Sequence, residues 1–196
     1  MIMEDKTLNE TESFGIITEM IKNARTNLRA KINCNILLFW GYAIVIISFL
    51  VWFLKIKNYF GGTSLFWLLI PLICIPATLY MHSKDKTKIT SYIDKSVFYI
   101  TLLFAVICTA TAISTMIIDY PILFIEQLFI SSMIVIVGIL IRYKAIIVGG
   151  IIGIIAAHIL LFIPDMVSQI PIFAATFIFS IIIPGHIFKK SINSHV

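Results

Sequence analysis

The sequence is poor in charged residues, and this scarcity excludes most soluble folds. Only 13% of its 196 residues are Asp, Glu, Lys or Arg, whereas 60% are hydrophobic. A typical soluble domain has about 25% charged and about 45–50% apolar residues. The chain has too little polar surface to stay in water, and we expect the lipid bilayer to be its solvent.

Paired cysteines and the motifs of common enzymes are also missing. Cys34, Cys74 and Cys108 form no CxxC pair and lie in or beside apolar runs, so we interpret them as small buried hydrophobic side chains. HExxH, GxSxG, P-loop and GxGxxG motifs are absent. The sequence separations between His82, His186 and His195 match no zinc-site spacing. We therefore expect no catalysis, no metal and no cofactor.

A cleavable secretory signal is not evident. Residues 1–13 carry acidic side chains and lack the basic region, apolar core and small-residue cleavage site of such a signal, and no lipid-attachment motif occurs. We expect the first apolar run to remain in the protein as a signal anchor.

What the sequence does contain is six apolar runs long enough to cross a bilayer, which takes about 20 helical residues. Their continuous length favours helices, because a spanning segment must satisfy its own backbone hydrogen bonds. The predicted fold is an all-α, polytopic membrane helical bundle of six transmembrane helices (residues 34–187), between a cytoplasmic segment 1–33 and a tail 188–196. The expected spans are 34–54, 65–81, 96–118, 121–141, 145–163 and 170–187.

The basic residues predict the orientation of this bundle. If the N-terminus is cytoplasmic, the inner segments hold 13 Lys and Arg residues and the outer segments hold two, Lys55 and Lys57. Cytoplasmic loops carry such an excess. We expect both termini on the cytoplasmic side of a bacterial inner membrane. This asymmetry accounts for the net charge of +5 without a nucleic-acid partner.

Residues 11–31 read as an amphipathic helix ahead of the first span. Phe14, Ile17, Ile21, Ala24 and Leu28 recur at helical spacing, with charged residues elsewhere on the wheel. Such a helix either lies on the inner leaflet or packs under its own bundle. Alternatively, it docks a cytosolic protein partner or a second copy of the chain in a homo-oligomer.

Two ionisable residues, Glu126 and His158, fall inside predicted spans, where burial costs at least about 2.5–3.5 kcal/mol and such residues are functional candidates. Both lie about 8 Å below the outer surface by helical rise. Equal depth on consecutive helices makes a proton-sharing pair geometrically possible. The alternative is that Glu126 reaches into water at the interface.

Small and hydroxylated residues mark further candidate positions. Thr109, Thr111, Ser114 and Thr115 either line a polar cavity with Glu126 and His158 or bond back to their own helix. Gly149, Gly153 and Ala157 recur every four residues and form a strip for close helix packing, within the bundle or across a dimer. Pro71 and Pro76 in the second predicted span and Pro184 in the sixth would bend these helices and leave backbone carbonyl groups without a helical hydrogen bond.

Several segments resemble a family of uncharacterised small membrane proteins of the Bacteroidota. They are ESFGIITEMIKNAR at 12–25, FWGY at 39–42, FWLLIP and SYIDK between 66 and 95, the GG pair of the fifth span and the IIPGHIF ending. Similar proteins are encoded beside small winged-helix regulators. The resemblance implies a role in signalling or envelope response, and it supplies no activity or site residue.

Two functions follow as hypotheses. The first is a regulatory or scaffolding membrane protein that acts through protein contacts at the N-terminal helix and the 82–95 loop. The alternative is a small-solute or ion transporter, possibly coupled to protons through Glu126 and His158.

Overall fold

The computed structural model describes residues 14–16, 18, 34–57, 63–84 and 92–193. This part of the chain is all-α, in agreement with the predicted fold class. Its seven α-helices, with one 3₁₀ segment (η1) and one π-helical segment (η2), are α2 (Cys34–Ile56), η1 (Thr63–Leu68), α3 (Leu69–Lys84), α4 (Tyr92–Ser114), α5 (Ile122–Leu140), α6 (Lys144–Leu160), α7 (Met166–Phe177), η2 (Ile178–Ile182) and α8 (Ile183–Asn193).

The length and composition of these helices make the chain a multi-pass membrane protein. Five helical stretches are long and apolar enough to cross a bilayer, and a sixth, Lys144–Leu160, is apolar but shorter. Large apolar side chains also cover the outside of the bundle, among them Ile117 (85% exposed) and Phe162 (86% exposed). Soluble proteins rarely expose broad apolar surfaces of this kind, and lipid would cover them here.

Most of the predicted N-terminal helix at 11–31 lies outside the described residues, although 14–16 and 18 are helical. Residues 85–91 of the 82–95 loop also lie outside them.

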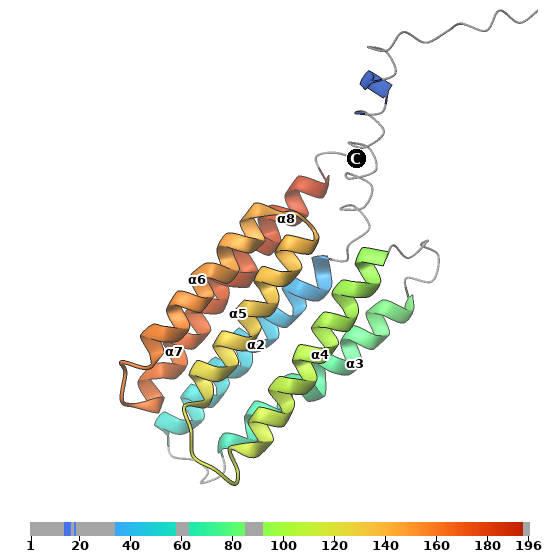
Figure 1. The fold of residues 1–196 in the computed structure, drawn as a ribbon. Coiled ribbons are helices and arrows are strands. Elements are labelled where there is room, and N and C mark those ends of the chain that lie inside the picture. The colour runs from blue at the N-terminus through green and yellow to red at the C-terminus, as the bar shows by residue number, and fades with distance from the viewer. Residues whose placement is uncertain (1–13, 17, 19–33, 58–62, 85–91, 194–196) are drawn as a thin grey trace, which may run out of the picture.

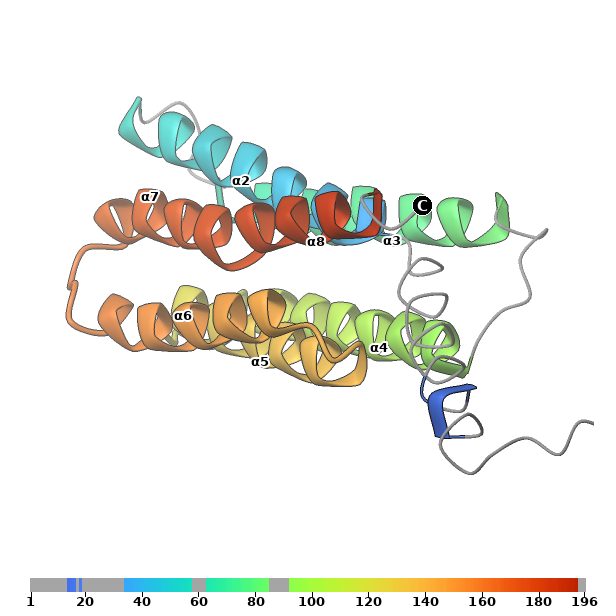
Figure 2. The same cartoon turned by 90° about the horizontal axis from the view of Figure 1, so that it is seen from above.

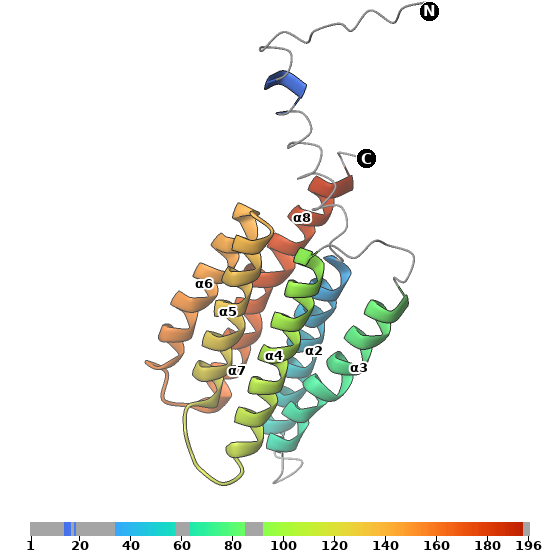
Figure 3. The ribbon, with the colours of Figure 1, turned by 45° about the vertical axis from the view of Figure 1, so that its right-hand side comes forward.

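The helices form two layers. In Figure 2, α2, α3, α7 and α8 lie in one layer and α4, α5 and α6 in the other. Helices joined by a loop run in opposite directions, whereas α7, η2 and α8 form one continuous stretch, so the helix ends gather at two ends of the bundle (Figures 1 and 3). We call the end that carries Arg142, Lys144, Lys189 and Lys190 the basic end, and the other, which carries Asp165, the opposite end.

The two layers are joined most closely where α6 meets η2. Pro184 has no N–H to give to the carbonyl of Ser180 four residues earlier, and the chain adopts a π-helix over this turn, with the N–H of Ile183 bonded to the carbonyl of Ile178. Gly149 of α6 faces this turn. A Cβ at Gly149 would lie 2.5 Å from the Ser180 carbonyl oxygen, so only glycine permits this approach.

Several helix boundaries differ from the predicted spans by three to six residues, among them the end of α6 at Leu160 and the end of α8 at Asn193. At two boundaries the difference is explained by polar side chains, which hydropathy cannot place. The last helical stretch begins at Met166 rather than near 170, because the Asp165 carboxylate accepts bonds from the backbone N–H (2.9 Å) and hydroxyl (2.8 Å) of Ser168. These bonds hold the pKa of Asp165 below its usual value. The α4 helix ends at Ser114 rather than near 118, and the Tyr120 hydroxyl bonds its last turn at Thr111 O and the Ser114 hydroxyl.

Candidate functional site

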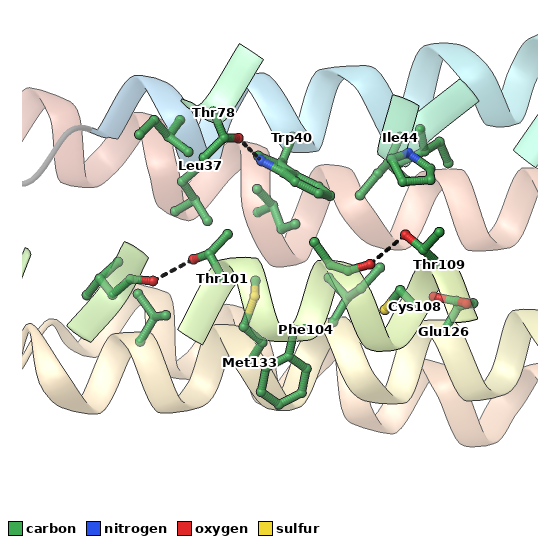
Figure 4. Close-up of a pocket in the computed structure, with 18 of the residues that line it drawn as sticks. Leu37, Trp40, Ile44, Thr78, Thr101, Phe104, Cys108, Thr109, Glu126 and Met133 are labelled. Carbon is green, nitrogen blue, oxygen red and sulfur yellow. Dashed lines mark hydrogen bonds between the residues drawn. The ribbon is translucent and has the colours of Figure 1, made fainter. Parts of the chain in front are cut away.

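A cavity of about 180 Å³ lies between the two layers, with α2 and α3 on one side and α4 and α5 on the other. Figure 4 shows it from within, with Trp40 and Ile44 of α2 facing Phe104 of α4 and Met133 of α5. On α4 the lining residues extend from Val97 to Ala112, which corresponds to about 22 Å of helix. The cavity is therefore long and narrow and follows the helix axes.

Apolar and aromatic side chains make up most of the lining, including Trp40, Trp67, Phe98, Phe104, Met133 and Phe173. Three threonine hydroxyls of the lining are already used within the protein. The Thr78 hydroxyl accepts the Trp40 indole N–H at 2.8 Å and donates to the Cys74 carbonyl at 2.7 Å. The Thr101 and Thr109 hydroxyls donate to carbonyls one turn back on α4. These three hydroxyls therefore have no donor left for a ligand, although Thr101 and Thr109 keep acceptor lone pairs.

Glu126 is the exception in this lining. It is the one acidic residue among the described lining residues and lies in the fifth position of α5, toward the opposite end. One carboxyl oxygen accepts a bond from the Thr111 hydroxyl at 2.6 Å, a hydroxyl that also has the Cys108 carbonyl in reach at 2.9 Å, and the Cys108 thiol lies beside the carboxyl. Both partners are neutral, and no basic side chain of the described chain acts on Glu126. Since a carboxylate accepts up to about four bonds, it retains acceptor capacity toward the cavity.

The structure does not bring Glu126 and His158 together. The His158 side chain is exposed on the outside of α6, where Nδ1 donates to the Ile154 carbonyl at 2.9 Å. Its ring contacts Phe124 edge-on, with centroids 5.6 Å apart. Phe124 and Glu126 differ by about 200° around α5, so His158 and the cavity lie on different faces of that helix. The structure therefore does not contain the proton-sharing pair of Glu126 and His158 that the sequence made possible.

The hydroxyls predicted around Glu126 divide into two groups. Thr111 contacts the carboxyl, and Thr109 lines the cavity. Ser114 bonds Thr111 O and the Tyr120 hydroxyl, while Thr115 donates to the Ala112 carbonyl at 2.6 Å. Ser114 and Thr115 thus help to end α4 and do not line the cavity.

The strip of small residues on α6 packs inside the chain. Gly149 faces η2, whereas a Cβ at Gly153 would collide with the Ser131 hydroxyl of α5. Ala157 is fully buried on the same helix. The described contacts of the two glycines are within the bundle, so they require no second copy of the chain.

Three features were not anticipated from the sequence, two in the cavity lining (Trp67 and His82) and one outside it, where Gln127 packs toward α6. The Trp67 indole N–H is buried without a hydrogen-bond partner among the described residues, and so is the Gln127 carbonyl oxygen. The Gln127 amide nitrogen contacts the Ser131 hydroxyl at 3.2 Å. At the other end of the cavity, His82 stacks on Phe98 with centroids 4.0 Å apart. Of these residues, only Gln127 stands out in the sequence, as a polar residue next to Glu126 inside an apolar run.

Metal binding and the scaffolding hypothesis gain no support from the described residues. Within these ranges no three His, Cys, Asp or Glu side chains are grouped so that they could hold a metal ion. The two segments on which a scaffolding role depends, 11–31 and 82–95, fall largely outside the ranges. The cavity is thus the candidate site whose residues are described most completely by the structure.

Comparison with known proteins adds no family to this description. No protein-family model, curated protein or solved structure significantly matches the chain.

Proposed function

We propose that this chain is a six-span transporter of the bacterial inner membrane that binds a small, elongated and mostly apolar molecule in the cavity between its helix layers. The observation that carries the proposal is the cavity itself, about 180 Å³ in volume and lined along about 22 Å of α4. A site that follows the helix axes suits movement of a molecule between the two ends of the bundle.

The six-span arrangement is supported by α6 together with its flanking turn. Lys144–Leu160 has 17 residues, or about 26 Å of helix, against a hydrocarbon core of about 30 Å. Leu161 and Phe162 extend this apolar stretch in turn conformation, and Ile163 follows them. Basic residues at the basic end support placing both termini on the cytoplasmic side.

The shape of the cavity distinguishes it from a packing defect in the core. It is partly open rather than enclosed, so a small molecule has access to the space.

The volume of the cavity limits the ligand. An engineered apolar cavity of about 150 Å³ binds benzene, whereas drug-sized pockets have about 300–1,000 Å³. A molecule with a single ring, a short chain, or one ring that carries a short chain therefore fits the cavity. The apolar lining indicates that most of its surface is hydrocarbon.

The test is to fill the cavity and measure binding. Ala105 is 5% exposed and lines the cavity, so Ala105→Phe places a ring in the space. Ala110 is exposed on the same helix, and Ala110→Phe makes the matched change away from the cavity. We expect fluorine NMR of para-fluoropentylbenzene in micelles to show saturable binding to the wild type and Ala110→Phe but not to Ala105→Phe. Equal behaviour of the two variants would contradict the proposal.

A further inference from the structure

We infer that the cavity selects amines: its ligand is a single-chain or arylalkyl amine whose ammonium group pairs with Glu126 and whose hydrocarbon body lies along the cavity toward Trp40 and Phe104. The inference rests on the proposed function and names the chemical class of the ligand. It starts from the charge of the lining, where the described residues include one carboxyl group and no Lys or Arg.

The position of Glu126 determines which end of the ligand is polar. The carboxyl lies near the opposite end of the cavity, and Figure 4 shows Glu126 beside Cys108 at the same end as Thr109. Toward the basic end, the lining is formed by apolar side chains such as Val137, Ile141 and Phe188, with His82 stacked on Phe98. A ligand with one polar head and one apolar body therefore fits in one direction only.

The hydrogen-bonding capacity of Glu126 disfavours a hydrocarbon end and an acidic head group. A hydrocarbon end would leave the free acceptor capacity of the carboxyl buried and unpaired, which is unfavourable. A carboxylate head would place two acids side by side. An ammonium head supplies three donors and a positive charge, and charge-assisted bonds of this kind are the strong ones.

The aromatic side chains of the lining also favour an ammonium head group. Trp67 lines this cavity from η1, ahead of α3, and its ring meets Phe173 edge-on with centroids 5.7 Å apart. Its buried N–H has no partner in the described part of the chain, but this group is a donor and cannot pair with an ammonium, so only the ring can contribute to binding of an amine. Tryptophan and phenylalanine rings attract cations through their faces, and this attraction strengthens where water is excluded.

The experiment compares three probes that differ only in the head group. They are para-fluorophenylbutylamine, the same chain ending in a methyl group (para-fluoropentylbenzene), and the same chain ending in a carboxylate. Dissociation constants are measured by fluorine NMR for the wild type and Glu126→Gln in the same micelles, so that partitioning of each probe into detergent cancels in the comparison. Asp165→Asn, which makes the same acid-to-amide change outside the cavity, is the matched control.

We expect Glu126→Gln to weaken amine binding by about tenfold or more while leaving the methyl-ended probe unchanged. Asp165→Asn should leave amine binding unchanged. Equal binding of the amine to wild type and Glu126→Gln would overturn the inference and leave the proposed function standing, as would a preference for the carboxylate. Saturable binding of none of the probes to the wild type would overturn both. If Glu126→Gln does not fold, the affinities of the three probes for the wild type are compared instead, with Ala105→Phe as the reference for binding outside the cavity. The inference then requires the amine to bind the wild type more tightly than the other two probes.

Discussion

Among single residues, Gly149 shows how the absence of a side chain shapes the bundle. A Cβ there would lie 2.5 Å from the Ser180 carbonyl oxygen and 2.6 Å from Pro184 Cγ. The first of these is a backbone atom in a π-helical turn, which has no rotamer by which to move away.

We therefore expect Gly149→Ala to lower the free energy of unfolding by about 1–3 kcal/mol, the usual effect of overpacking a close contact. Thermal unfolding in detergent, followed by circular dichroism, measures it. Gly15→Ala is the control, because a Cβ at Gly15 meets nothing within 4 Å. An unchanged melting temperature for Gly149→Ala would mean that α6 and η2 are not packed as described.

Asp165 gives a pH dependence whose sign can be worked out. Bonds from the Ser168 hydroxyl and backbone N–H lower the pKa of Asp165 in the folded state relative to the unfolded state. Its contribution to stability is thus complete above the unfolded pKa of about 3.9 and is lost as the pH falls through the lower folded value.

We expect Asp165→Ala to lower the melting temperature at pH 7, since α7 loses its N-cap, and the difference from wild type to shrink as the pH falls below about 4. Melting curves of both proteins between neutral and acidic pH test this. Asp165→Asn, which keeps a capping oxygen but does not titrate, should be affected less than Asp165→Ala at pH 7. A difference that stays constant with pH would show that the charge of Asp165 does not contribute.

At the scale of elements, the sequence predicts the helices well because their signal is local. Each apolar run corresponds to a helical stretch, and the all-α class follows from run length alone. The errors lie at the ends, where single hydrogen bonds decide, as at Asp165 and Tyr120. The division of the last stretch into α7, η2 and α8 also depends on a specific residue, Pro184, and on the approach of α6.

The shortest apolar helix, α6, makes the most specific test of the proposed topology. In a chain without its native cysteines, Lys144→Cys and Phe162→Cys place one thiol at either end of α6, both at exposed positions. We expect a membrane-impermeant maleimide added to intact spheroplasts to label Phe162→Cys, and to label Lys144→Cys only after permeabilisation. Labelling of both from the same side would show that α6 does not cross the membrane.

At the scale of the whole molecule, the candidate site was only partly predictable. Glu126 stands out in the sequence because a carboxyl in an apolar run is rare, and Thr111 was placed near it correctly. The pairing with His158 failed because helical rise gives depth but not the direction in which a side chain points. The cavity itself brings together lining residues from Ile36 to Phe188, and nothing local in an apolar sequence marks a place where packing is incomplete.

The measurement that tests the central claim most directly is quenching of single-tryptophan proteins by para-bromopentylbenzene in nanodiscs. Trp40 lines the cavity, whereas Trp52 does not and packs edge-on against Phe49. If the molecule binds in the cavity, a protein that keeps only Trp40 should be quenched saturably and more strongly than one that keeps only Trp52, and Ala105→Phe should remove the difference. Quenching of Trp52 that equals or exceeds that of Trp40 would show that the probe only dissolves in the surrounding lipid and would contradict the account.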